Sequence, residues 1–191
     1  MNSSVGTSAR ILDVAEELIQ TQGYNGFSYQ DVADRIGIRK ASIHHHYSGK
    51  AVLAAAVVER YRGRWQEMLA EIDRELSDPR KKLDRYFHPF RATIRTADRA
   101  CLCGMLGAEF TSLEPAVKEQ VKGFFTDNKR WLAKLLNQGK GVGVFEFRGT
   151  ALSEADLIFS CLEGALLVAR ACGDANQFEA VADQLKARLR V

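Results

Sequence analysis

Residues 28–50 read SYQDVADRIGIRKASIHHHYSGK. We expect Ser28 to cap a short helix, with Asp31 three residues later, and Gly37 to end that helix. A second short helix is expected over residues 39–46. Two short helices joined by a glycine-containing turn are the outline of a helix-turn-helix, in which the second helix enters the major groove of DNA.

The charge of the chain supports this interpretation only when it is resolved along the sequence. In total, 27 Lys+Arg against 24 Asp+Glu give a net charge of +3, which is too small to identify a nucleic-acid-binding protein. Residues 37–50, however, contain three basic residues, three histidines and no acid, whereas residues 1–50 carry five basic and five acidic residues. Attraction to phosphate requires such a local excess of positive charge. We therefore expect the second short helix to face DNA.

Length and composition indicate a globular protein. At roughly 150 residues per domain, 191 residues make one domain or two small ones, and 46% hydrophobic with 27% charged residues is an ordinary globular balance. The sequence shows neither a transmembrane-length apolar run nor a signal-peptide pattern, so we expect a cytoplasmic protein with no membrane partner. The four cysteines lack zinc-site spacing, so we expect reduced thiols and neither a metal nor a cofactor.

Apolar residues recur every three or four positions along most of the chain, which predicts amphipathic helices and an all-α fold. The longest of these patterns covers residues 50–76. Prolines that follow capping residues predict helix starts at Pro79 and Pro115. Residues 139–149 contain four glycines and are expected to form a loop.

The helical patterns divide the chain into two regions. The first is short-helical, and we expect it to be a three-helix helix-turn-helix domain over residues 1–50. The second is expected to be a helical bundle over residues 51–191 for ligand binding and dimerisation. Within it, Ser153 and Asp156 have the spacing of a capping box, although with an acid shorter than usual.

A series of motifs over about forty residues resembles the DNA-binding domain of the TetR/AcrR family of repressors. The motifs are ILDVA at residues 11–15, GY at 23–24, FS at 27–28, DVA at 31–33 and GIRKASIHHHYSGK at 37–50. The resemblance implies a homodimeric repressor of transcription that binds palindromic operator DNA. It also implies that a small-molecule effector, bound to the helical C-terminal domain, releases the protein from DNA.

The resemblance further implies roles for individual residues. Lys40, Ala41, Ser42 and His44 are expected to face the major groove, and Tyr29 and Gln30, at the start of the preceding helix, are expected to reach its edge. Phosphates, which set register rather than sequence preference, are expected to contact Ser28, His45, His46 and Lys50. Arg39 joins this DNA-binding set through its charge, and Ile43 and Tyr47 are expected to lie in the core. The three successive histidines diverge by about 100° per residue on a helix, so they are not expected to chelate one metal ion.

The region after residue 50 contains no catalytic motif, so we do not expect an enzyme. Its large apolar side chains and the polar residues among them are candidates for lining an effector cavity. These candidates are Trp65, Met68, Phe90, Ile94, Met105, Glu109, Phe125, Asn128, Trp131, Phe159 and Glu163. A buried polar group needs a partner, so Glu109, Asn128 and Glu163 are the strongest candidates for binding the polar end of a ligand.

Two further segments carry expectations about surfaces. Residues 157–169 are apolar nearly all round, which predicts a helix buried on two sides. We therefore expect a homodimer formed through the helices near residues 153–172 and 175–190. Residues 80–99 contain seven basic residues and two acids, which we interpret as a solvated face, with an acidic effector or attraction to the DNA backbone as alternatives.

Three other functions stay open at this point. The segment CLCGMLGAE, residues 101–109, resembles one subgroup of the family, and Cys101 or Cys103 could sense electrophiles or oxidants in a thiol-based repressor. A helical small-molecule-binding protein without DNA binding is a second alternative, which the charge bias of residues 37–50 disfavours. An activator or architectural DNA-binding protein is the third.

Overall fold

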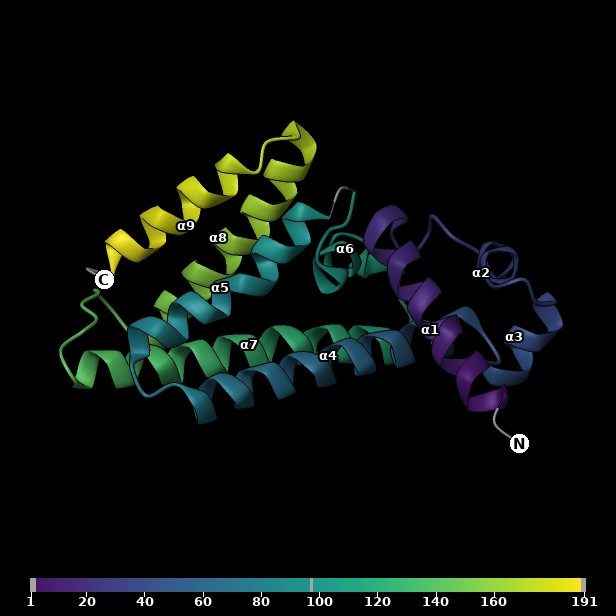
Figure 1. Cartoon of the computed structure of the whole chain (residues 1–191), viewed down its shortest axis with the longest axis horizontal. Coiled ribbons are helices and arrows are strands. Elements are labelled where there is room, and N and C mark those ends of the chain that lie inside the picture. The colour runs from purple at the N-terminus through teal and green to yellow at the C-terminus, as the bar shows by residue number, and fades with distance from the viewer. Residues whose placement is uncertain (1–2, 97, 190–191) are drawn as a thin grey trace. The chain divides into compact units, whose positions relative to one another are not determined.

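The structure is a computed structural model that describes residues 3–96 and 98–189. All elements assigned in these ranges are helical (Figure 1), which confirms the predicted all-α fold. They are α1 (Ser3–Gln22), α2 (Tyr29–Ile36), α3 (Lys40–His46), α4 (Lys50–Glu75), α5 (Pro79–Arg95), α6 (Leu102–Ala108), the 3-10 turn η1 (Phe110–Ser112), α7 (Pro115–Gly141), α8 (Ala151–Cys172) and α9 (Asn176–Arg188). None of these described helices combines the length and the apolar character needed to cross a membrane.

Local signals placed most helix starts correctly. Pro79 and Pro115 begin α5 and α7, as predicted. The side chain of Asp78 caps α5 by accepting a hydrogen bond from the backbone N–H of Arg80 at 2.9 Å. These starts were predictable because a capping oxygen and the fixed φ of proline act within one turn.

The predicted capping box of Ser153 and Asp156 is wrong. Helix α8 begins at Ala151, and its N-cap is Thr150, whose hydroxyl accepts a hydrogen bond from the N–H of Ser153 at 3.1 Å. Asp156 instead forms an ion pair with Lys129 of α7, with 2.9 Å between Nζ and Oδ1. Thr150 and Ser153, three residues apart, can both act as caps, and Thr150 is the one that does. Asp156, the acid that would complete the predicted box, is engaged with Lys129.

The predicted loop over residues 139–149 begins later than expected, because α7 continues to Gly141. The ring of Phe145, 3% exposed, folds back over Gly139. A Cβ atom at position 139 would lie 2.0 Å from that ring. Gly139 is therefore explained by the close approach of an aromatic side chain to the helix and not by a loop conformation.

Backbone contacts divide the chain into two compact units. Unit 1 consists of Met1–Gly63 and Leu102–Phe124, and unit 2 of Arg64–Cys101 and Phe125–Val191. Two of the three divisions fall inside α4 and α7, and the third falls directly before α6 (Leu102–Ala108), whereas the sequence placed a domain boundary near residue 50. The functional division at that residue stays a prediction.

Unit 1 is built on α1, which packs against both α2 and α6, while α2 packs against α3. The apolar stripe of α1 supplies Ile11, Ala15, Leu18 and Ile19, each at most 1% exposed. Val32 and Ala33 of α2 are equally buried. A continuous apolar core therefore supports the two short helices, which are too short to be stable alone.

Unit 2 contains an aromatic core in which α8 packs against α9 and α5 packs against α8 (Figure 1). Its centre is Tyr86, which is 0% exposed and stacks on Trp131 with 5.3 Å between ring centroids. Phe90 and Trp65 lie 5.6 Å and 6.1 Å from the same ring. Clustered rings of this kind contribute both buried area and favourable edge-to-face contacts.

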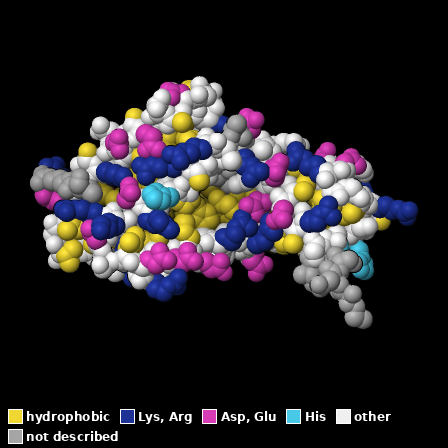
Figure 2. Space-filling model, viewed as in Figure 1, with side chains coloured by type: hydrophobic (Ala, Val, Ile, Leu, Met, Phe, Trp, Pro, Cys, Tyr) yellow, Lys and Arg dark blue, Asp and Glu magenta, His cyan; other side chains and the backbone are white. Residues whose placement is uncertain are grey.

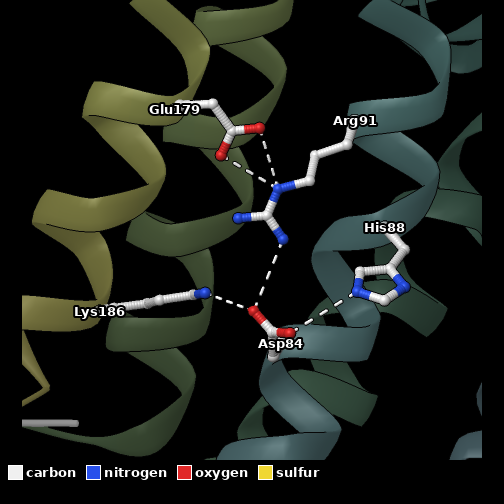
Figure 3. Close-up of polar contacts among 5 residues, drawn as sticks. All are labelled: Asp84, His88, Arg91, Glu179 and Lys186. Carbon is white, nitrogen blue, oxygen red and sulfur yellow. Dashed lines mark hydrogen bonds and ion pairs between the residues drawn. The ribbon is translucent and has the colours of Figure 1, made fainter. Parts of the chain in front are cut away.

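Part of the basic run at residues 80–99 stabilises unit 2 through ion pairs. Figure 3 shows that Asp84 on α5 accepts a hydrogen bond from Lys186 of α9. Arg91 donates to Glu179 at 3.0 Å and lies 3.5 Å from Asp84, and His88 Nε2 lies 3.6 Å from the same carboxylate. The hydrogen bond from Lys186, with the charges nearby, lowers the pKa of Asp84 below its usual range although burial opposes this.

The expectation of a wholly solvated basic face is wrong for Lys82. This side chain is 7% exposed and donates to Asp73 Oδ1 of α4 at 2.7 Å. On the visible face of unit 2, other Lys and Arg side chains lie beside Asp and Glu side chains (Figure 2). The run of positive charge in the sequence is therefore broken up by acids from other helices.

Candidate functional site

The start of α2 is held by a reciprocal set of hydrogen bonds. The Ser28 hydroxyl accepts from the N–H of Gln30 at 3.2 Å, and the N–H of Ser28 donates to Asp31 Oδ2 at 2.6 Å. This capping box confirms the predicted cap, and its hydrogen bonds lower the pKa of the Asp31 carboxyl. At the other end Gly37 has a φ of 77°, the left-handed conformation that glycine adopts most easily.

The orientation of α3 is determined by a few buried contacts. Ile43 is 0% exposed and Tyr47 is 9% exposed, so both lie in the core as expected. The hydroxyl of Tyr29 donates to the carbonyl of Tyr47 at 3.0 Å, and the guanidinium of Arg10 donates to the carbonyl of Ile36 at 2.9 Å. These contacts tie the turn and the end of α3 to α1 and α2.

The outer face of α3 carries the residues predicted to contact DNA. Lys40, Ala41, His44 and His45 are exposed at spacings of one and four, which place them on one side of the helix. Ser42 and His46 are half-buried at its margins. Of the predicted DNA-binding residues before this helix, Ser28, Gln30 and Arg39 are exposed. The structure thus brings most of the predicted set onto one surface, although their contacts with DNA stay predictions.

Tyr29 differs from the rest of the predicted DNA-binding set. It is only 6% exposed, its ring lies 4.7 Å from that of His44, and burial raises its pKa to about 12. The structure therefore places Tyr29 under His44 as a support. A direct contact with a base would require it to leave this position.

Lys50, the first residue of α4, is directed inward and not toward solvent. Its ammonium donates to the carbonyl of Phe27 and lies 4.6 Å and 4.4 Å from the ring centroids of Tyr24 and Phe27. Burial lowers its pKa, and the carboxylates of Glu109 and Glu114 partly oppose this. Its predicted phosphate contact would compete with these bonds to the α1–α2 loop.

Glu109, whose predicted role in ligand binding stays a prediction, holds the α1–α2 loop in this structure. Its carboxylate accepts hydrogen bonds from the N–H of Tyr24, and from the N–H and side-chain amide of Asn25 at 3.1 Å and 3.0 Å. Gly23, with a φ of 82°, lets the carboxylate approach, because a Cβ there would lie 2.7 Å from Glu109 Oε2. We call this set of contacts the Glu109 clamp.

The clamp is extended by two neighbouring contacts. The hydroxyl of Tyr24 donates to Glu114 Oε2 at 2.7 Å, and the side-chain amide of Asn25 donates to the hydroxyl of Ser112 at 2.9 Å. The segment from α6 to the start of α7 thereby positions the loop that enters the helix-turn-helix. Linear sequence could not reveal this, because the partners are separated by more than eighty residues.

The remaining predicted ligand-binding residues fall into several places. Trp65, Phe90 and Trp131 belong to the aromatic core around Tyr86, and Asn128 Oδ1 accepts a hydrogen bond from the Tyr86 hydroxyl at 2.9 Å. Ile94 lines a separate small cavity. Met68 is a half-buried residue of α4 in unit 2, whereas Met105, like Glu109, lies in unit 1.

Three predicted residues meet at one cavity of about 460 Å³ in unit 2. We call it the α7–α8 cavity, and it is lined by Phe125, Lys129, Asp156, Phe159, Ser160 and Glu163. Its volume is in the range of small-molecule sites. The sequence missed Lys129, Asp156 and Ser160 as lining residues. Only Ser160 left a signal, as a polar interruption of the apolar run.

Glu163 is the most unusual of the residues that line this cavity. Both carboxyl oxygens are buried, and within the described part of the chain no nitrogen or oxygen atom donates a hydrogen bond to them. Burial raises the pKa of Glu163 to about 7, and the thiol of Cys101, a weak donor, offsets only part of that rise. A carboxyl with this environment is a candidate for binding a ligand.

The cysteine and histidine side chains were the remaining candidates for a disulfide or a metal site. The four cysteines form no disulfide: Cys101 and Cys103 are buried, Cys161 is half-buried and Cys172 is exposed. Among residues 3–96 and 98–189, no three His, Cys, Asp or Glu side chains are grouped so that they could hold a metal ion.

Comparison with known proteins agrees with this geometry. A family model described as "Bacterial regulatory proteins, tetR family" matches residues 11–57, and one described as "Tetracyclin repressor-like, C-terminal domain" matches residues 79–185. The chain is 24% identical over 185 residues to an uncharacterized HTH-type transcriptional regulator in the lacX 3' region of Lactococcus lactis subsp. lactis, covering 94% of this chain and 91% of that protein.

Two solved structures resemble the whole chain. A TetR-family transcriptional regulator from Agrobacterium tumefaciens is 34% identical with a TM-score of 0.93, over 97% of this chain and 98% of that one. A TetR regulator from Legionella pneumophila is 34% identical with a TM-score of 0.89, over 99% and 100% of the two chains. The matches span both the helix-turn-helix and the helical region that follows it, and this chain belongs to the TetR family of bacterial transcriptional regulators.

Proposed function

We propose that this chain is a ligand-responsive repressor. As a homodimer in the cytoplasm it binds palindromic operator DNA through α2 and α3, and a small molecule in unit 2 releases it. The observation that carries the DNA-binding half is the exposed, acid-free face of α3, supported from below by Tyr29 and Ile43. A positive face on a rigidly held short helix suits the major groove.

The proposal of a homodimer is supported by the outer surface of α8. Leu157 and Val168, eleven residues apart and so on one side of the helix, are 37% and 53% exposed, and Leu167 beside them is 42% exposed. Exposed aliphatic residues in a row on a helix are typical of a subunit interface. A second copy of the chain would cover this row and complete the burial that the sequence predicted for residues 157–169.

Release by a ligand requires two states of the dimer that bind DNA differently. Helices α4 and α7 each contribute residues to both units, so a shift of either helix is a route from the α7–α8 cavity to unit 1. In unit 1 the Glu109 clamp links α6 to the loop before α2. A change in that link would alter the separation of the two recognition helices, and half-sites in the operator must match this separation.

The test is a binding titration of the full-length protein with fluorescently labelled DNA from the region upstream of its own gene. We expect a complex that is resistant to excess random DNA and whose footprint contains two half-sites about one helical turn apart. Sedimentation of the free protein should show a dimer at micromolar concentration. Equal affinity for upstream and random DNA, or a monomer under these conditions, would contradict the proposal.

The thiol-sensing alternative stays a prediction. Cys101 and Cys103 are 4% and 0% exposed, so neither thiol is accessible to a bulky electrophile in this conformation. Treatment of the protein–DNA complex with N-ethylmaleimide, followed by mass spectrometry and a repeat of the titration, tests it. Release that accompanies alkylation of either residue would support the alternative over a reversible ligand.

A further inference from the structure

The charges around the α7–α8 cavity are unevenly matched. Lys129 and Asp156 form an ion pair at 2.9 Å, so these two lining residues neutralise one another. Ser160 carries no charge. The charge that remains among the lining residues is that of Glu163, and it is negative when the carboxyl ionises.

The immediate neighbours of Glu163 do not satisfy its carboxyl group. The Cys101 thiol donates only weakly, and the nearby Tyr86 hydroxyl donates to Asn128. A buried carboxyl without strong donors is costly to the fold, and such groups are uncommon in folded proteins. Its position is explained if a bound molecule supplies the missing donor.

Two aromatic rings complete the environment of this carboxyl. Phe125 of α7 and Phe159 of α8 both line the cavity, with 5.9 Å between ring centroids and an angle of 63° between ring planes. The faces of aromatic rings carry partial negative charge and attract cations. A carboxylate beside such rings is therefore complementary to a positively charged organic group, whereas it repels an anion.

We propose that the α7–α8 cavity binds an organic cation that consists of an apolar ring system and an ammonium group. Glu163 and the rings of Phe125 and Phe159 hold the ammonium group. Binding itself is independent of the proposed function, but the conclusion that this cation is the effector rests on it. A cavity of about 460 Å³ has room for a molecule of two fused rings with a short amine-bearing chain.

The pH dependence of binding follows from the environment of Glu163. With a pKa of about 7, its carboxyl is mostly neutral at pH 6 and mostly ionised at pH 8. The other titratable or charged groups around it are Tyr86 from α5, Cys101, Lys129 from α7 and Asp156 of α8. Because only the ionised carboxyl pairs with a cation, affinity should rise about tenfold between these two pH values.

Isothermal titration calorimetry of the full-length protein with three matched probes tests the proposal. The probes are 2-naphthylmethylammonium, 2-naphthalenemethanol and 2-naphthylacetate, which share a ring system and differ in charge. We expect the ammonium to bind tightest, and Glu163→Gln, which keeps the size of the side chain, to weaken its binding by about tenfold or more while leaving the alcohol unchanged. Asp183→Asn removes the same charge from the exposed surface of α9 and should change nothing.

The pH titration of the unaltered protein needs no variant to fold and gives a second, independent readout. Tightest binding of the alcohol or the carboxylate, or ammonium affinity that is the same in Glu163→Gln or at pH 6 and pH 8, would overturn the proposal. Adding the ammonium probe to the protein–DNA complex separates the two proposals. If the ammonium probe binds in a way that depends on Glu163 but the DNA is not released, the cation site is supported and its role as the effector site is contradicted.

Discussion

Unit 1 and unit 2 each contain a glutamate that is at least partly buried, and the two differ in the hydrogen bonds that their carboxyl groups accept. Glu109 accepts hydrogen bonds from two backbone N–H groups and one side-chain amide. Glu163 has buried oxygens to which the described nitrogen and oxygen atoms donate nothing. Hydrogen bonds to a charged group are strong, and a buried charged group without them destabilises the folded state. The environment of Glu109 therefore stabilises the α1–α2 loop, whereas that of Glu163 favours the binding of a ligand.

The largest effect should come from breaking the Glu109 clamp. Glu109→Ala removes the acceptor for Tyr24 and Asn25, and we expect a loss of about 3 kcal/mol in the free energy of unfolding, with weaker DNA binding. Glu109→Gln keeps one acceptor oxygen and should lose less. Chemical denaturation and DNA titration of both variants measure this. An unchanged unfolding free energy for the alanine variant would show that the clamp is not stabilising.

The next effect concerns the pH dependence of stability, which Glu163 should control. Its pKa rises from 4.5 to about 7 on folding, so the folded state resists ionisation. The free energy of unfolding should therefore fall by about 2–3 kcal/mol as pH rises from 4.5 to 7, and the loss should persist above pH 7. Glu163→Gln should abolish this pH-dependent loss. The variant should therefore have a higher free energy of unfolding than the unaltered protein at pH 8, and the difference should be absent at pH 4. Parallel pH profiles for the two proteins would contradict the assignment.

Substitutions at the DNA-binding face should separate two roles, at a cost of about 1–3 kcal/mol each. His44→Ala removes an exposed group of α3 and should relax sequence preference. Lys50→Ala should weaken binding to all sequences about equally, because its expected contact is with a phosphate and its ammonium also holds the Phe27 carbonyl. Titration against operator and scrambled DNA distinguishes them. The same loss of preference in both variants would refute the separation.

The smallest effect is expected from removing the buried hydrogen bond between Tyr86 and Asn128 in unit 2. Tyr86→Phe removes the hydrogen bond to Asn128, and since Asn128 is 1% exposed, we expect a loss of about 1 kcal/mol in unfolding free energy. Binding of 2-naphthylmethylammonium should be nearly unchanged. This variant is a matched control for Glu163→Gln, because it alters a buried polar group near the same cavity without removing a charge.

The helix-turn-helix could be predicted in detail because its determinants are local. The Ser28 capping box and Gly37 act within one helical turn of the residues they organise. The exposed positions of α3 follow from helical periodicity once Ile43 is placed in the core. Local signals failed at the start of α8, where the cap is Thr150 and not Ser153, and the pairing of Asp156 with Lys129 was not visible in the sequence.

The sequence by itself determined the all-α class, the family and the residues that α3 exposes, since periodicity, caps and motifs depend on neighbours in the chain. It also marked Glu109, Asn128 and Glu163 as polar residues within apolar surroundings. Only the tertiary structure distinguished them: Glu109 clamps a loop, Asn128 pairs with Tyr86, and Glu163 lacks a strong partner. The partners come from helices distant in sequence, and whether a buried carboxyl is satisfied depends on atoms that only folding brings within 3 Å or so of it.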